Sequence, residues 1–477
     1  MKPKLEWSTY QKDIFRDVAY GSGHTIIVAR AGSSKTTSLV ESIKYIPKKL
    51  KTLFVAFNKK IAEELNERIN KSYCDTMTLH SLGFRAIRNA FGSDVVLNND
   101  KAFYIAKELL EPFKASKQEQ DDYETIQSLC NIVGLCKGHL IDTPTKIDEL
   151  MDKFGIDVGD IDREDFIKLV CQCLKQCKNN KKVIDFNDMV WFCAVYNLSP
   201  GSYDRVFIDE AQDLNAAQIQ LALSACKKDG RICAVGDNFQ AIYAFAGADS
   251  ESINNIQKRL NAKTLPLPIS YRCATSIIKL AQELVPDIQP APFAKEGSVS
   301  YIKEKELLTS VAPGDFILSR VNAPLIKYCL KLLKMKVPAN IQGRDVGANL
   351  SYLIKKSKKK TVESFLIWLT KWGKEEIKRL QEKNRDATIV IDKIECLENL
   401  CEEAKTLDDV KDNIKELFVD GDDSKRVILS SVHKSKGLER ARVFVLGWTL
   451  RESNQEECNI KYVAFTRAKE SLFIVEK

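Results

Sequence analysis

Short apolar runs alternate with longer amphipathic stretches along most of this chain. In the first half, such runs occur near residues 25–28, 52–56, 206–208 and 232–235. Runs of this length, bounded by polar and turn residues, predict buried strands, and the amphipathic stretches between them predict helices. This alternation is typical of a parallel, doubly wound sheet. Residues 91–182 lack strand runs and are predicted to form a mostly helical insertion.

The second half of the chain repeats the pattern. Its predicted strands lie at residues 299–302, 315–318, 427–430, 443–446 and 471–475. We therefore predict an α/β fold with two parallel sheets, each interrupted by a helical insertion. The predicted boundaries are 1–90 and 183–265 for the first sheet domain, 91–182 for its insertion, 266–347 and 425–477 for the second sheet domain, and 348–424 for its insertion.

Composition agrees with a globular protein of several domains. The 477 residues are too many for one core and suggest roughly two to four domains. The net charge of +8 is compatible with a polyanionic partner. The sequence has no apolar run of about 18 residues, and its N-terminus lacks the apolar core of a signal peptide. We therefore expect no membrane segment and no secretion.

Fourteen cysteines in such a chain point to reduced thiols in a cytosol-like compartment. Cys171, Cys173 and Cys177 form the densest group. A metal or iron–sulfur site is one interpretation of that spacing, although no paired C-x-x-C is present. Because Val170, Cys173 and Cys177 recur at helical spacing, a buried helix face is the simpler interpretation.

A polar loop rich in small residues follows the first predicted strand and leads into a helical pattern. In a strand–loop–helix unit, backbone N–H groups and the helix N-terminus bind phosphates, while Lys35 reaches the terminal phosphates and Thr36 reaches Mg²⁺. Ser34 stands where the general pattern G-x-x-x-x-G-K-[ST] has its second glycine, a position that favours backbone freedom. The loop consists of Ala29, Arg30, Ala31, Gly32, Ser33, Ser34, Lys35, Thr36 and Thr37.

Two carboxylates, Asp209 and Glu210, follow the apolar run at residues 206–208. Carboxylates that end a parallel strand lie at the edge of the sheet where α/β proteins bind ligands. Mg²⁺ prefers one or two carboxylates together with phosphates. We therefore predict that Asp209 and Thr36 hold the metal and that Glu210 is the base that orients a water. Taken alone, the same residues fit an acidic loop, but the phosphate loop upstream favours the catalytic interpretation.

More blocks follow in a fixed order, at residues 235–248, 269–272, 431–439 and 462–468. With the phosphate loop and the acidic block, they resemble the UvrD/Rep/PcrA group of superfamily 1 DNA helicases from Gln11 to Lys469. Residues 53–59 also resemble the F-box-helicase branch of that group. The resemblance implies two RecA-like P-loop NTPase domains, with ATP and Mg²⁺ as cofactors. Because the chain ends just after the last block, we expect no appended nuclease domain.

The resemblance also implies roles around the ATP. Arg272 and Arg467 are implied as cations on the γ-phosphate, at the cleft between the two RecA-like domains. Gln240 is implied as the γ-phosphate sensor that couples to the strand-binding side. The other implied ATP-binding residues are Gln11 and Tyr271 at the adenine, Glu439 at the ribose or phosphate, and Gly437 in the same block. Gln11 also fits an exposed helix residue.

By the same resemblance, single-stranded DNA is bound by stacking on aromatic residues and by contacts to its backbone. Phe245 replaces the usual tryptophan and Ala246 the usual arginine, so we expect a weaker grip, because tryptophan has the larger π face and arginine adds charge. Phe57 and Tyr243 also fit plain core packing. The implied DNA-binding residues are Phe57, Tyr243 and Phe245 for stacking, and Asn58, Thr78, His80, Ser431 and His433 for other contacts.

The second insertion is shorter than in well-known members of this group, and its charge is uneven. Residues 351–384 carry ten Lys/Arg and four Asp/Glu, whereas residues 385–424 carry five Lys/Arg and thirteen Asp/Glu. The lysine-rich run at residues 355–360 fits a grip on duplex phosphates. It fits a solvated face or a nuclear-import signal equally well.

Together these patterns predict an ATP-dependent DNA helicase or translocase, whose 3′→5′ direction is implied by the resemblance alone. The alternatives are a translocase that strips proteins from DNA with little unwinding, a nucleic-acid clamp with a decayed ATPase, and an RNA helicase, since stacking does not select the sugar. Implied partners are single-stranded DNA and single–double-strand junctions, with single-strand-binding, replication or recombination proteins as candidates. The expected location is the cytoplasm, nucleoid or nucleus, and the compact insertion also suits a virus-encoded protein. Repair, recombination and replication are all open as pathways.

Overall fold

A computed structural model gives the fold of this chain. The residues it describes are 6–56, 59–69, 74–113, 119–154, 156, 158, 161–243, 247, 251–382, 386–402, 404–419 and 424–477. By their contacts, the residues form two compact units: Met1–Ala29 with Ser34–Leu267, and Arg30–Ser33 with Pro268–Lys477. No helix in the described ranges is long and apolar enough to cross a lipid bilayer.

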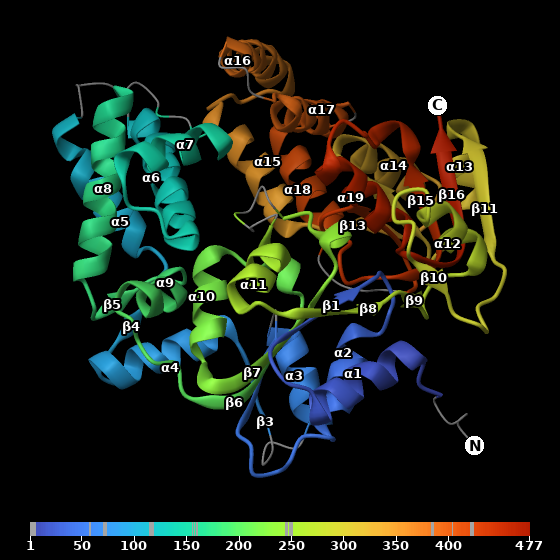
Figure 1. The fold of residues 1–477 in the computed structure, drawn as a ribbon. Helices are drawn as coiled ribbons and strands as arrows, with labels where there is room; N and C mark the ends of the chain where they lie inside the picture. Colours follow the sequence, from blue (N-terminus) through green and yellow to red (C-terminus); the bar gives the residue numbers. More distant parts are fainter. Residues whose placement is uncertain are drawn as a thin grey trace. The chain divides into compact units, whose positions relative to one another are not determined.

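The first unit is built on a six-stranded parallel sheet, seen in blue and green in Figure 1. Its strand order is β3-β2-β6-β7-β1-β8. The register places Cys233 of β7 opposite Thr25 of β1 on one side and Phe207 of β6 on the other, so the ends of β1 and β6 flank β7. The strands are β1 (Thr25–Ala29), β2 (Thr52–Ala56), β3 (Cys74–Thr78), β6 (Tyr203–Ile208), β7 (Cys226–Gly236) and β8 (Lys263–Leu267).

Helices cover both faces of this sheet because inner strands such as β1 and β2 are apolar on both faces. Ile27 of β1 packs in one buried cluster with residues of α1, α2 and α3, whereas its neighbour Ile26 packs in another with α4, α9, α10 and α11. This period-2 division is the geometry of a strand buried between two layers. The helices are α1 (Thr9–Tyr20), α2 (Lys35–Ile43), α3 (Lys59–Arg68), α4 (Leu79–Phe91), α9 (Asp188–Val195), α10 (Ala216–Ser224) and α11 (Ser252–Leu260).

The first insertion is a helical group whose core continues that of the sheet. It contains α5 (Lys101–Leu110), α6 (Glu119–His139), α7 (Pro144–Phe154) and α8 (Arg163–Asn179), which stand together in Figure 1. Cys173 and Cys177 are buried on the inner face of α8 beside Phe166 and Val170. The prediction that residues 91–182 lack strands was wrong in one detail, since β4 (Val96–Leu97) pairs with β5 (Val183–Ile184). Two-residue strands are too short to leave a period in the sequence.

The second unit is built on another six-stranded parallel sheet, with the order β11-β16-β15-β12-β14-β13. Its last strand, β16, lies between β11 and β15, so the end of the chain is paired on both sides. The predicted α/β fold with two parallel sheets is confirmed. The strands are β11 (Ser298–Lys303), β12 (Phe316–Ser319), β13 (Ala339–Ile341), β14 (Val427–Ser431), β15 (Arg440–Leu446) and β16 (Ala468–Glu476), with β9 (Ile269–Ser270) and β10 (Gln289–Pro290) as a separate pair.

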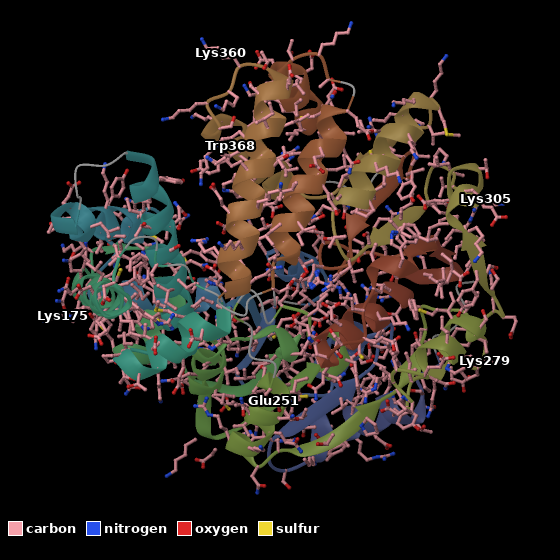
Figure 2. The ribbon with its side chains drawn as sticks, turned by 90° about the horizontal axis from the view of Figure 1, so that it is seen from above. Lys175, Glu251, Lys279, Lys305, Lys360 and Trp368 are labelled. Atoms are coloured by element: carbon pink, nitrogen blue, oxygen red, sulfur yellow. The ribbon has the colours of Figure 1, made fainter. Side chains whose placement is uncertain are left out.

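The helices of the second insertion share one hydrophobic cluster with this sheet. Leu350, Phe365 and Leu397 of the insertion belong to the same buried cluster as Ile317 and Leu429 of the strands. The insertion is therefore packed as part of the second unit. The helices of this unit are α12 (Thr275–Ala281), α13 (Glu304–Ser310), α14 (Ala323–Lys334), α15 (Arg344–Lys356), α16 (Val362–Glu382), α17 (Thr388–Cys401), α18 (Leu407–Leu417) and α19 (Gln455–Phe465). Lys360 and Trp368, labelled in Figure 2, mark the α15–α16 turn and α16.

Candidate nucleotide-binding site

The phosphate loop connects β1, which ends at Ala29, to α2, which begins at Lys35. Gly32 and Ser34 both have left-handed backbone conformations, with φ of 73° and 60°. Glycine adopts such a φ without cost, but serine carries a Cβ that opposes it. Ser34 therefore holds the conformation that a glycine would hold at this point, and the loop closes onto the helix N-terminus where anions bind.

The acidic block lies at the carboxyl end of β6 and meets this loop. Thr36 Oγ1 donates to Asp209 Oδ2 at 2.6 Å. Lys35 Nζ lies 2.9 Å from Glu210 Oε2. The structure thus brings together the two residues predicted to bind the metal and pairs the predicted base with the phosphate-loop lysine. A carboxylate beside a hydroxyl is a set of hard oxygen donors that suits Mg²⁺.

Negative charge exceeds positive charge among the residues around Lys35. Burial, then the charge of Glu210, raises the pKa of Asp209 to about 6. Burial by itself would lower the pKa of Lys35, but three neighbouring carboxylates outweigh it and raise that pKa. These carboxylates belong to Glu210, Asp237 and Asp209. One ammonium among three carboxylates leaves room for a bound cation, which would favour the ionised form of Asp209.

A chain of hydrogen bonds links the predicted sensor Gln240 to the carboxylate of Glu210. Gln240 Nε2 donates to Asp237 Oδ2 at 2.7 Å. The Asp237 N–H donates to Gln212 Oε1 at 3.1 Å, and Gln212 Nε2 donates to Glu210 Oε2 at 2.5 Å. Asp237 and Gln212 had no predicted role, although Asp237 stands in the block at residues 235–248 and Gln212 is two residues after Glu210. The network gives Gln240 a fixed relation to Glu210.

In the second unit, Arg272, Glu439 and Arg467 lie together. Arg272 Nε is 2.5 Å from Glu439 Oε2. Arg467 is only 1% exposed, and its Nη2 has no hydrogen-bond partner among the described residues. Burial, then the positive charge of Arg272, lowers the pKa of Arg467 to about 9. A buried guanidinium nitrogen without an acceptor is costly unless an anion completes it, so this cluster fits a phosphate.

The four loop residues grouped with the second unit make defined contacts there. Arg30 donates from Nε and Nη2 to the two carboxylate oxygens of Asp287, each at 2.7 Å. The Ala31 N–H donates to Tyr462 Oη at 2.9 Å, and the Tyr271 N–H donates to the Gly32 carbonyl oxygen at 2.9 Å. Gly32 leaves no room for a Cβ, because one would lie 2.6 Å from Arg272 Cβ.

Models of known protein families match two parts of this chain. The model of the UvrD/REP helicase N-terminal domain matches residues 10–261, more than half of the sequence. The chain belongs to the UvrD/Rep helicase family. A second model, of the UvrD-like helicase C-terminal domain, matches residues 426–475.

Individual members of the family are distant in sequence. The ATP-dependent DNA helicase UvrD1 of Mycobacterium tuberculosis is 25% identical over 64% of this chain and 41% of its own length. The F-box DNA helicase protein 1 of Schizosaccharomyces pombe is 25% identical over 99% of this chain and 58% of its own. The ATP-dependent DNA helicase PcrA of Staphylococcus aureus is 23% identical over 55% of this chain and 38% of its own. This UvrD-family chain thus spans between about two fifths and three fifths of these relatives.

Predicted nucleic-acid residues occur in both units. In the first, Thr78 caps α4 by accepting from the Ser81 N–H at 3.2 Å. In the second, the Ser431 hydroxyl oxygen accepts from the Lys434 N–H at 3.4 Å, and burial with the nearby positive charges of Arg320 and Lys436 lowers the pKa of His433 to about 4. Tyr243 is partly buried. Phe57, Asn58 and Phe245 lie outside the described residues.

One aromatic residue was missed by the sequence reasoning. Phe186 is 50% exposed and its ring stacks on His80, with centroids 3.8 Å apart and planes 19° apart. Burial lowers the pKa of His80 to about 4, so its imidazole is neutral at pH 7. In the sequence, Phe186 is distinguished only as an aromatic residue between the polar residues Asp185 and Asn187, just before the apolar helix α9. Phe293 is a similar case, exposed and 6.1 Å from the ring of Tyr271.

Gln11, predicted at the adenine, is only 3% exposed. Its Oε1 accepts from the Ser8 N–H at 3.0 Å in a capping box of α1, and its Nε2 donates to Ser38 Oγ at 2.9 Å. The side chain therefore ties the start of α1 to α2, directly behind the phosphate loop. It is not the exposed helix residue of the alternative interpretation.

Proposed function

We propose that this protein is an ATP-dependent DNA helicase or translocase that moves along single-stranded DNA in the 3′→5′ direction. The observation that carries the proposal is the pairing of Lys35 with Glu210 and of Thr36 with Asp209 across the first sheet. Membership of the UvrD/Rep family supports it, as do the names of relatives that are ATP-dependent DNA helicases. The direction is proposed from that family alone.

Each residue has a part in this proposal. Lys35 binds the terminal phosphates, and Thr36 and Asp209 hold Mg²⁺, which supplies positive charge to the phosphates. Glu210 orients the attacking water and accepts its proton. The role proposed for Arg272 and Arg467 is to neutralise charge that develops on the γ-phosphate, which is the step where electrostatic stabilisation contributes most. Gln240 relays the state of the phosphates through Asp237.

Single-stranded DNA is proposed to bind by stacking and by backbone contacts. The stacked rings of His80 and Phe186 offer an exposed aromatic surface, and base–aromatic stacking contributes about 1–3 kcal/mol per base. Because every base has a π-face, a stacking surface of this kind accepts any base sequence.

The first test is ATP hydrolysis by the purified chain, with and without single-stranded DNA, beside Lys35→Ala. We expect stimulation by DNA in the parent and a loss of roughly 100-fold or more in the variant, because one charged group on the transferred phosphate is removed. Lys44→Ala, at the other end of α2 and exposed to solvent, is the matched control and should retain the parent rate. DNA binding without hydrolysis above the Lys35→Ala level would contradict the motor and leave a clamp.

The short second insertion supports a second candidate, a translocase that strips proteins from DNA but unwinds poorly. A tailed duplex and a protein block on a single strand separate the two. Strand separation from a 3′ tail supports the helicase, displacement of the block alone supports the stripper, and activity only from a 5′ tail contradicts the proposed direction.

A further inference from the structure

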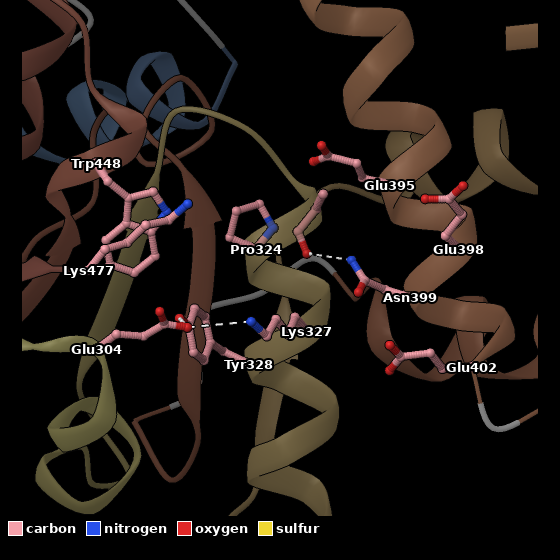
Figure 3. Close-up of a pocket in the computed structure, with 11 residues that line it drawn as sticks. Glu304, Pro324, Lys327, Tyr328, Glu395, Glu398, Asn399, Glu402, Trp448 and Lys477 are labelled. Atoms are coloured by element: carbon pink, nitrogen blue, oxygen red, sulfur yellow. Dashed lines mark hydrogen bonds and ion pairs between the residues drawn. The ribbon is translucent and has the colours of Figure 1, made fainter. Parts of the chain in front are cut away.

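A groove lies on the second unit, away from the proposed ATP residues in sequence and lined by parts of α13, α14 and α17 and the segment after β15. Its cavity is about 560 Å³, which is within the range of about 300–1,000 Å³ found for ligand-binding pockets. Two smaller hollows adjoin it and share Trp448 and Lys477. We call this surface the Trp448 groove. Figure 3 shows Trp448 and Lys477 on one side and the glutamates of α17 on the other.

Three carboxylates line one face of α17 in the groove. Glu395, Glu398 and Glu402 are spaced by three and four residues, the spacing of a single helix face. None of the three side-chain carboxylates makes an ion pair or hydrogen bond with another residue in the described part of the chain. Burial, then the negative charges of Asp392 and Glu398, raises the pKa of Glu395. The charge of Lys477 acts in the opposite direction, but four glutamates against two lysines line the groove, so its lining carries a net negative charge.

Aromatic rings on the opposite wall already hold ammonium groups. Lys477 Nζ lies 6.0 Å from the centre of the Trp448 ring, and Lys327 Nζ lies 5.9 Å from that of Tyr328. Both distances lie at the outer limit of about 6 Å for cation–π interactions. A wall of this kind, facing three carboxylates, is suited to the stem and head of a lysine or arginine side chain.

The charge of the surrounding chain argues against nucleic acid as the ligand of this groove. Residues 385–424, which contain α17 and α18, carry five Lys/Arg and thirteen Asp/Glu, within a protein whose net charge is +8. Phosphates would be repelled here, whereas a basic protein segment would be attracted and steered.

We propose that the Trp448 groove docks a lysine- or arginine-bearing segment of a partner protein. The basic side chains enter between α14 and α17 and pair with Glu395, Glu398 and Glu402, while Trp448 covers their apolar stems. This docking goes beyond the proposed motor function and does not depend on ATP hydrolysis.

The test uses the full chain and a short fluorescent peptide of alternating lysine and serine, followed by anisotropy. We expect saturable binding that weakens more than about tenfold in the triple variant E395Q/E398Q/E402Q, because three charge-assisted contacts lose their charge. The matched control is D408N/D412N/E416Q, which removes three exposed acidic charges from α18 in the same insertion and should bind like the parent. A glutamate–serine peptide should not bind.

Trp448→Leu provides an independent variant, because it keeps every charge but removes the ring that faces the cation. It should weaken the peptide several-fold. ATP hydrolysis of all variants and thermal melting of the charge variants should match the parent, whereas Trp448→Leu should melt cooperatively at a somewhat lower temperature, because Trp448 packs against the hydrophobic cluster of the second unit. Equal weakening in the α18 control, or no peptide binding by the parent, would overturn the proposal. Displacement of the peptide by duplex DNA from the groove would overturn it in favour of nucleic acid, and concentration-dependent dimerisation that E395Q/E398Q/E402Q abolishes would identify a second copy of this chain instead.

Discussion

At the scale of single residues, Ser34 is a non-glycine residue of the phosphate loop with a left-handed backbone. Its φ of 60° lies in the left-handed region, and its hydroxyl makes no capping hydrogen bond to α2. A left-handed backbone costs a residue with a Cβ roughly 1–2 kcal/mol. Glycine avoids this cost but loses more conformational entropy on folding, so that a substitution by glycine recovers only part of the free energy. We predict that Ser34→Gly raises the free energy of unfolding by about 0.5–1 kcal/mol and increases ATP affinity.

Ser34→Ala isolates the cause, because it removes the hydroxyl but keeps the Cβ. It should leave stability and ATP affinity close to the parent values in denaturant unfolding and nucleotide titration. If alanine and glycine had the same effect, the hydroxyl and not the backbone would set the behaviour of the loop.

The sequence predicted some contacts between single residues of the site but not others. The types and order of Thr36 and Asp209 indicated adjacency at a sheet edge, and the structure places them 2.6 Å apart. The engagement of Gln11 with Ser8 and Ser38 was not predictable, because a capping box and an adenine-reading amide need the same residue type near a helix start. Phe186 was missed because an isolated aromatic residue has no periodicity.

At the scale of elements, the first insertion is joined to the sheet by a buried ionic cluster. Asp188, at the start of α9, contacts Lys101 of α5 at 2.7 Å and Lys137 of α6 at 2.8 Å. All three side chains are buried. We predict that Asp188→Asn destabilises the protein by about 3–5 kcal/mol, since it removes the carboxylate that pairs with buried Lys101 and one of the two that pair with buried Lys137, and that urea unfolding will show this as a lower midpoint.

Asp94→Asn is the control for this prediction, because Asp94 pairs with Lys182 at the base of the same insertion but in solvent. It should leave the urea midpoint unchanged, as exposed pairs are screened by water and salt. Similar losses from both variants would mean that the effect arises from net charge and not from burial.

The burial and length of each strand explain whether the sequence predicted it. Strands such as β2, β6 and β14 are apolar on both faces, and their runs predicted them directly. β3 was missed because it lies at the edge of the sheet and reads Cys-Asp-Thr-Met-Thr, with only its first residue buried. The three-residue strand β13 is too short to be distinguished from a loop.

At the scale of the whole molecule, each unit is held by its own hydrophobic core. Within the part of the chain that the structure describes, the main cluster of the second unit runs from Leu307 to Val475 and includes no residue from the first unit. Its sheet is likewise made only of strands that follow residue 268. Sequence patterning predicted two such sheets, but not their strand orders, because parallel pairing joins segments far apart in the chain and leaves no local signal.

We predict from these cores that residues 268–477 fold without the first unit. Expressed alone, this fragment should show a single cooperative thermal transition, because its buried cluster and its six parallel strands are complete. The matched control is a fragment of residues 268–467, which lacks only β16 (Ala468–Glu476) and should not fold, since β16 pairs with both β11 and β15. Calorimetry and circular dichroism measure both outcomes. A fragment of residues 268–477 that melts without cooperativity would mean that the first unit supplies stability that the second core does not contain.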